Sequence, residues 1–212
     1  MIGRLIAREV RRGLTGAAWL PVAFFLLVAT IVPFAVGPDA RLLARIGGGA
    51  LWIAALTAAL LPVERLIEPD RADGVLDQLA LTGTTEEAAG AAKMIGHWMT
   101  FGPLLLLAAV PGSFLVGLDG PSLARSLVSL AIGTPALAAL AVAVAALTAG
   151  LPRAGGLAGL LMMPLAVPLV IFGAAATGDA QGSALKLEAA VALLLVAGAP
   201  FVTGAAIRAS RT

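Results

Sequence analysis

The sequence contains no cysteine and only 1 histidine among its 212 residues. The absence of cysteine excludes disulfides, thiol chemistry and cysteine-ligated metal sites. A single histidine leaves no cluster of metal ligands at a useful spacing, so we predict no metal site. No glycine-rich run ends in Gly-Lys-Ser or Gly-Lys-Thr, and the chain therefore has no Walker motif with which to bind ATP.

Charged residues are also scarce, at 12% of the chain, whereas 60% of the residues are hydrophobic. Six long stretches hold no charged residue at all: Ala17–Pro38, Ile46–Val63, Met94–Leu118, Ser126–Pro152, Ala154–Gly178 and Ala189–Ile207. A helix needs about 20 apolar residues to cross the hydrocarbon core of a bilayer. Since peptide groups in lipid must be paired within their own segment, we predict an all-α membrane protein with six transmembrane helices.

We expect a single transmembrane domain over residues 1–212, with spans near 17–38, 46–63, 94–118, 126–151, 155–177 and 189–207. The only sizeable connection is 64–93, which leaves no room for a soluble catalytic domain, so we predict no catalytic residues and no enzyme activity. The predicted spans contain no charged residue, which argues against the proton and ion relays that pumps use.

The distribution of lysine and arginine predicts the orientation of the chain. One set of connections, which includes both termini and the loop 64–93, holds 10 of the 14 basic residues. The other set holds Arg41, Arg45, Arg125 and Lys186. By the positive-inside rule, both termini and the loop 64–93 should lie in the cytoplasm. Trp19 and Trp98 should then anchor the cytoplasmic interface and Trp52 the outer one.

Residues 1–16 have the pattern of an amphipathic helix. Apolar residues fall on one helical face, and the basic residues Arg4, Arg8, Arg11 and Arg12 gather on the other. Such a helix is suited to lie in the surface of an anionic membrane, and the basic excess does not imply nucleic-acid binding. Glu9 projects nearer the apolar face, and we favour a local pair with Arg12 at i+3 over a contact with a partner protein.

The loop 64–93 carries seven of the 12 acidic residues of the chain. Within it, Val75, Leu76 and Leu79 form a short apolar helical stripe. Asp73 is placed to cap the start of this helix, and Thr82-Gly83 to end it.

A second helix should follow directly. Thr84 with Glu87 matches a capping box that opens a helix leading into the third span. The stripe on the first helix could dock on another protein or pack against the bundle of this chain, and periodicity alone does not distinguish the two. We interpret the carboxylates of residues 64–77 as a solvated acidic loop.

His97 and Trp98 lie a few residues into the third predicted span. We favour an interfacial histidine whose polar tip reaches the headgroups, as amphipathic side chains commonly do. The alternative is a haem contact by His97 and Trp98, in which His97 would be an axial ligand of the iron.

A series of short elements occurs along the chain in a characteristic order: Gly37-Pro38-Asp39, Leu42-Leu43-Ala44-Arg45-Ile46, Leu51-Trp52, Ala54-Ala55-Leu56, Glu64-Arg65-Leu66, Asp70, Asp73-Gly74, Leu76-Asp77-Gln78-Leu79, Ala92-Lys93, His97-Trp98, Gly133-Thr134-Pro135 and Ile171-Phe172-Gly173. In these residues and their order the chain resembles the CcmB family, the haem exporter protein B permeases of bacterial cytochrome c maturation. Each element is short, but together and in this order they are specific.

The resemblance implies an ABC-2-type permease with six spans, a surface helix at the amino terminus and a separate ATPase subunit. By this resemblance, the helix that couples the permease to the ATPase would consist of the residues Asp73, Gly74, Val75, Leu76, Asp77, Gln78 and Leu79. The partners implied are the ATPase CcmA, the membrane proteins CcmC and CcmD, the haem chaperone CcmE and a second copy of the chain. The location implied is the bacterial inner membrane.

The resemblance also implies that ATP and Mg²⁺ bind to the partner ATPase, and that haem is cargo or is held by partners. We expect no cofactor on this chain, since its three tryptophans stand apart and form no tryptophan-rich haem-handling segment. Two other functions stay open, a permease for another lipid-like cargo and a membrane scaffold for haem delivery that transports nothing.

Overall fold

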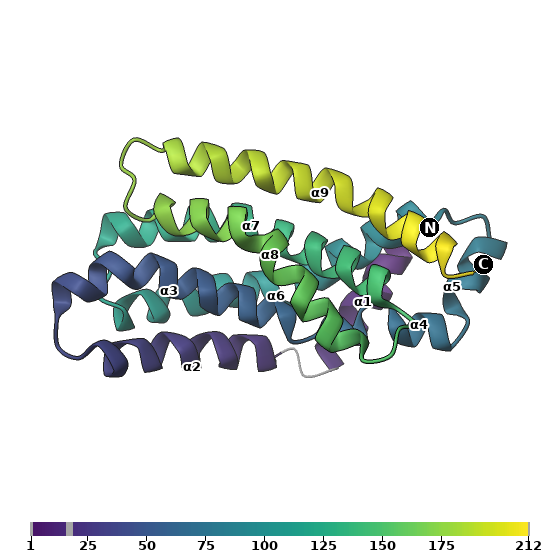
Figure 1. Cartoon of the computed structure of the whole chain (residues 1–212), viewed down its shortest axis with the longest axis horizontal. Helices are drawn as coiled ribbons and strands as arrows, with labels where there is room; N and C mark the ends of the chain where they lie inside the picture. The colour runs from purple at the N-terminus through teal and green to yellow at the C-terminus, as the bar shows by residue number, and fades with distance from the viewer. Residues whose placement is uncertain (1, 16–18, 212) are drawn as a thin grey trace.

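The computed structural model describes residues 2–15 and 19–211, and within these ranges it contains helices and no strand (Figure 1). Six helices of this part of the chain are long and apolar enough to cross a membrane. They are α2 (Trp19–Val36), α3 (Ala40–Leu60), α6 (Glu86–Leu115), α7 (Gly120–Thr148), α8 (Ala154–Ala176) and α9 (Ser183–Ala209). The predicted fold class is therefore confirmed. Residues 17 and 18 of the first predicted span, and residues 1, 16 and 212, lie outside the described ranges.

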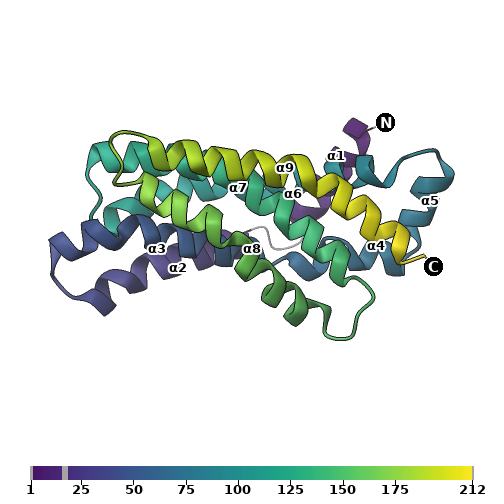
Figure 2. The ribbon, with the colours of Figure 1, turned by 45° about the horizontal axis from the view of Figure 1, so that its top comes forward.

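Four shorter helices complete the described fold: α1 (Ile2–Thr15), the 3₁₀ helix η1 (Val63–Arg65), α4 (Glu68–Ala72) and α5 (Val75–Leu81). Figures 1 and 2 show that α1, α4 and α5 gather at one end of the elongated bundle, together with both ends of the chain. The termini and the loop 64–93 thus lie at the same end, as predicted. That this end faces the cytoplasm stays a prediction.

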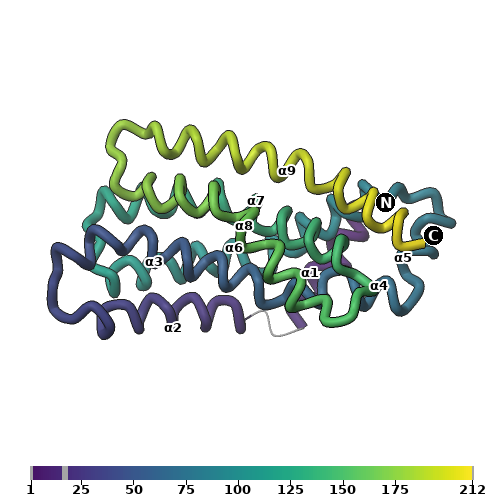
Figure 3. Tube along the Cα trace, in the orientation of Figure 1, coloured from purple at the N-terminus to yellow at the C-terminus, as the bar shows by residue number. Residues whose placement is uncertain are grey.

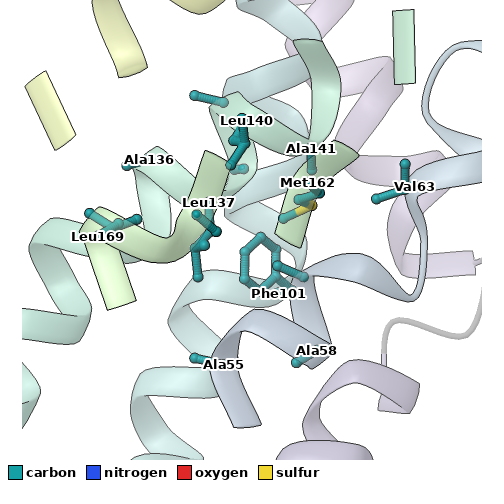
Figure 4. Packing of buried hydrophobic residues seen from close by; sticks show 14 of the residues in the cluster. Ala55, Ala58, Val63, Phe101, Ala136, Leu137, Leu140, Ala141, Met162 and Leu169 are labelled. Carbon is teal, nitrogen blue, oxygen red and sulfur yellow. The ribbon is translucent and has the colours of Figure 1, made fainter. Parts of the chain in front are cut away.

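Helix α7 forms the centre of the bundle and packs against α6, α8 and α9. The tube in Figure 3 shows α2 and α9 at opposite edges, with α3 and α7 between them. Much of the buried face of α7 is alanine, including Ala136, Ala138, Ala139 and Ala141, all 0% exposed. Small residues let helix backbones approach closely, which is the main means of helix association in lipid. In Figure 4, Phe101, Leu137 and Met162 are among the larger side chains of this core.

Trp52 lies in the core at 1% exposure, and its indole nitrogen donates to the Ser129 hydroxyl at 2.9 Å. A side chain at Gly133 or Gly173 would overlap its ring, so α7 and α8 approach Trp52 closely. The prediction that Trp52 anchors the outer interface is therefore wrong. The sequence indicates how deep a residue lies in the bilayer, but not whether it faces lipid or a neighbouring helix.

Four of the long helices, α3, α6, α7 and α9, begin earlier than the charge-free stretches, and in α6 and α9 this places a buried charged residue inside the helix. Lys93 lies in α6 at 3% exposure, and Glu188 lies in α9 at 0%. The expectation that no span contains a charge is therefore wrong for the helices as they form. Lysine and glutamate are good helix formers, so hydropathy predicts the apolar part of such a helix and misses its polar first turns.

Glu188 is buried beside Trp52 and Gly133 at the α7–α9 contact, and neither carboxyl oxygen has a hydrogen-bond partner among the described residues. An ionised carboxyl without a partner is costly in such surroundings. We therefore expect Glu188→Gln, which keeps the shape and cannot ionise, to match or exceed the wild type in thermal stability in detergent. Glu188→Ala should be less stable because it leaves a cavity. A Gln variant as unstable as the Ala variant would show that the bundle requires a carboxyl there.

Candidate functional site

The end of the bundle that holds both termini contains a buried group of charges, which we call the Asp70 cluster. Its members are Arg8, Glu9, Arg12, Asp70 and Lys93. Asp70, in α4, is only 1% exposed. Its carboxylate accepts hydrogen bonds from Arg8 and Arg12, each at 2.7 Å, and from the Lys93 ammonium group. The single carboxylate therefore joins α1, α4 and α6.

Glu9 and Lys93 complete the cluster. Glu9 pairs with Arg8 at 3.0 Å and with Lys93 at 3.4 Å. Lys93 also donates to the Leu66 carbonyl at 2.9 Å, so its ammonium group is surrounded by oxygen. The hydrogen bond to Asp70 raises the pKa of Arg8. Arg8 and Arg12 together hold α1 against the loop.

These contacts correct two predictions. Glu9 does not pair with Arg12, because Arg12 turns to Asp70 and Glu9 faces α6. The acidic loop is not solvated throughout, because Asp70 is buried by charges from α1 and α6. Hydropathy and local pairing rules do not detect ion pairs that join distant segments, and 62 positions separate Arg8 from Asp70.

Helix α1 lies along α6, where glycines admit it. A side chain at Gly96 would overlap Glu9, and a side chain at Gly13 would overlap Thr100. Arg4 and Arg11 are exposed on the outside, whereas Arg8 and Arg12 turn inward to Asp70. The predicted basic face is therefore divided between solvent and the cluster, and a membrane-surface role for α1 stays a prediction.

Helix α5 is the predicted coupling helix, and its apolar stripe faces this chain. Leu76 is 5% exposed and belongs to the hydrophobic core, while Val75 and Leu79 are half-buried. The side open to a partner consists instead of Asp73, Asp77, Gln78 and Leu81, with Leu81 88% exposed. Sequence reasoning missed Leu81 because it breaks the spacing of the stripe. Docking of an ATPase here stays a prediction, but Leu76 is not available for it.

The ends of these short helices differ slightly from the predicted ones. Gly74 precedes α5 in the left-handed region, at φ 70°, without a side-chain cap, so Asp73 is not the capping residue. Thr82 ends α5 and Gly83 follows at φ 77°, as predicted. Helix α6 is capped by Thr85, which accepts from the Ala88 amide at 3.2 Å, rather than by Thr84.

The carboxyl-terminal end of α9 holds α5 and α6 from the other side. Arg211 donates to Asp77 at 2.9 Å and to the Leu76 carbonyl at 2.8 Å, and also pairs with Glu86. Arg208 pairs with Glu87. This contact joins residues more than a hundred positions apart, so no local pattern could have predicted it. Movement of α5 would therefore act on both α6 and α9.

The structure does not bring His97 and Trp98 into one site. His97 is 6% exposed, its ring centroid lies 4.7 Å from that of Phe101, and its Nε2 atom has no hydrogen-bond partner among the described residues. Trp98 instead donates to the Thr134 hydroxyl at 3.1 Å. His97 is buried within the bundle rather than exposed at its outer surface, and Trp98, which is half-buried, hydrogen-bonds across to α7. Contact of either side chain with the membrane interface stays a prediction. A haem contact stays untested.

Six apolar helices, with short ion-paired helices gathered at one end, make this a multi-pass, all-α membrane protein. The family model described as CcmB protein matches residues 1–210, so the chain belongs to the CcmB family. This confirms the resemblance on which the expected partners rest.

Curated relatives of similar length support this assignment. Heme exporter protein B of Rhodobacter capsulatus is 44% identical over 211 residues, which cover 96% of this chain and 97% of that protein. Heme exporter protein B of Paracoccus denitrificans is 42% identical over the same shares of the two chains. The Escherichia coli K12 protein of that name is 40% identical over 218 residues, or 99% of each chain.

Proposed function

We propose that this chain is the membrane permease subunit of an ABC-type haem export complex that serves cytochrome c maturation. It couples ATP hydrolysis by a separate ATPase subunit to haem export or to release of the haem-loaded chaperone. Membership of the CcmB family and the names of its relatives support the haem system. The lack of a Walker motif supports an ATPase on another chain.

The observation that carries the coupling role is the attachment of α4 and α5 to the bundle. Asp70 joins α4 to α1 and α6, and Arg211 joins α5 to α9. A partner that pushes on the exposed side of α5 therefore moves two long helices and the surface helix together. Packed side chains and ion-pair networks of this kind can carry coupling between two sites.

The proposed partners have separate places and tasks. CcmA seats on α5 and holds ATP and Mg²⁺, while CcmC and CcmD contact the long helices within the bilayer. Haem is cargo or is held by CcmC and the chaperone CcmE, and this chain holds no cofactor. A second copy of the chain completes a symmetric permease, as homo-oligomers commonly do.

We place the complex in the bacterial inner membrane with both termini in the cytoplasm, in accordance with the basic bias of that end. The absence of cysteine makes this easy to test. We expect Gly120→Cys to react with an impermeant maleimide on intact spheroplasts, and Asp73→Cys only after the membrane is opened. Both positions are exposed, and Gly120→Cys leaves the Asp119 cap of α7 in place. Labelling of both variants from one side would reject the orientation.

The seating of the ATPase predicts a second result. We expect Leu81→Asp to reduce co-purification of the ATPase at least about tenfold, which corresponds to about 1.4 kcal/mol. The reason is that an unpaired carboxylate buried in an interface is strongly destabilising. Thermal stability of the permease should hardly change, because exposed substitutions shift stability by about 0.5 kcal/mol or less.

Leu151→Asp is the matched control, since Leu151 is 48% exposed in the loop between α7 and α8. It should retain the ATPase. Full ATPase binding by Leu81→Asp, or equal loss from both variants, would contradict docking on α5.

A further inference from the structure

A cavity of about 260 Å³ opens beside the Asp70 cluster, between α1, the start of α2, the region from the end of α3 to α4, and α6. Its charged lining consists of Glu9, Arg12, Arg65 and Lys93. It lies at the end of the bundle where the surface helix packs, and therefore where the membrane interface is expected.

The charge around the cavity is positive. In the Asp70 cluster, three basic groups face two carboxylates, which leaves one positive charge in excess. Arg65 adds a second, because it is exposed and has no ion pair within the described ranges. This charge favours an anionic ligand whose negative group lies near Arg65.

The remaining wall is largely apolar and leads to the outside of the bundle. Phe101 forms its inner part, whereas Leu20 and Leu61, at 40% and 41% exposure, form its rim. His97 also lines the cavity, although its Nε2 atom has no partner in the described structure. A buried imidazole nitrogen normally has a hydrogen-bond partner, so the cavity holds an unsatisfied polar group inside an apolar wall.

We propose that this cavity binds the headgroup of an anionic phospholipid. The phosphate lies between Arg65 and the basic side of the Asp70 cluster, and a headgroup or ester oxygen accepts from His97 Nε2. The acyl chains leave over Leu20 and Leu61 into the bilayer. Pockets that enclose a whole drug-sized ligand measure about 300–1,000 Å³, so a cavity of about 260 Å³ takes the headgroup end and leaves the chains outside.

The test uses the full chain, purified in detergent and titrated with phosphatidylglycerol or phosphatidylcholine. Bound lipid is counted by native mass spectrometry, and the thermal midpoint is measured in parallel. We expect phosphatidylglycerol to bind and stabilise the wild type more than phosphatidylcholine does. Arg65→Gln should weaken phosphatidylglycerol binding about fivefold, the effect of one basic residue at a lipid surface.

Arg11→Gln is the matched control, because it removes the same charge from an exposed residue that does not line the cavity. It should bind phosphatidylglycerol as the wild type does. His97→Phe keeps an aromatic ring without the nitrogen and should also weaken binding if the variant retains its thermal midpoint.

Three results would overturn the proposal. Equal loss from Arg11→Gln and Arg65→Gln would show attraction by the general surface charge, and equal binding of the two lipids would show no selection for an anion. The third result is that inorganic phosphate, or iron-free protoporphyrin, stabilises the wild type as much as phosphatidylglycerol does and loses this effect in Arg65→Gln. Phosphate would then assign the cavity to a free anion, and protoporphyrin would assign it to a porphyrin carboxylate, instead of a lipid.

Discussion

Asp70→Asn is expected to destabilise the protein by about 3–5 kcal/mol, the usual effect of removing one partner from a buried group of charges. The substitution barely changes volume, so the loss comes from charge. Arg8, Arg12 and Lys93 would then surround a neutral amide, and Glu9 alone would remain to neutralise them. Lys93 is only 3% exposed, so water would do little to replace the lost carboxylate.

The measurement is the thermal midpoint of the purified chain in detergent, together with its yield from membranes. Asp73→Asn is the control, since it removes the same charge three residues away from an exposed position. It should shift stability by about 0.5 kcal/mol or less. If the two variants melted together, Asp70 would not hold the short helices to the bundle.

The long helices and the shared end of the termini could be predicted from sequence, because both follow from composition. A charge-free stretch long enough to span the bilayer must be helical there, and an even number of spans returns the chain to the side where it began. The exact starts of α6 and α9 could not be predicted, since Lys93 and Glu188 continue a helix as readily as apolar residues do.

The candidate site was only partly predictable. The segment and end of α5 were predicted, because a short apolar stripe before Thr82-Gly83 is a local signal. The capping residues were each missed by one position, because Thr84 and Thr85 offer the same hydroxyl and only the backbone path decides between them. The sequence did not show which side of α5 is open to a partner, because the orientation of α5 depends on its hydrogen bonds with Arg211 at the far end of the chain.

The Asp70 cluster was missed for a related reason. Its residues come from three segments of the sequence, and each segment alone reads as an ordinary polar stretch. Arg8 and Arg12 satisfy a positive-inside rule whether they face lipid headgroups or a buried carboxylate. Tertiary packing decides between the two, and the glycines that let α1 approach α6, Gly13 and Gly96, give no signal by themselves.

Trp52→Ala is expected to destabilise the protein by about 3–5 kcal/mol, as truncation of a large core aromatic does. Trp52 is 1% exposed, and Gly133 and Gly173 leave room for its ring, so α7 and α8 have no larger side chain with which to fill the cavity. Ser129 would also lose the indole donor, although it keeps its bond to the Gly173 carbonyl at 3.1 Å.

Trp19→Ala provides the matched control, because Trp19 is 67% exposed at the start of α2. Both variants remove the same atoms from a helix of the same bundle, so the difference between their thermal midpoints in one detergent isolates the effect of burial. We expect a large fall for Trp52→Ala and a small one for Trp19→Ala. Equal falls would mean that both tryptophans act as interfacial anchors, and that α3, α7 and α8 do not close around Trp52.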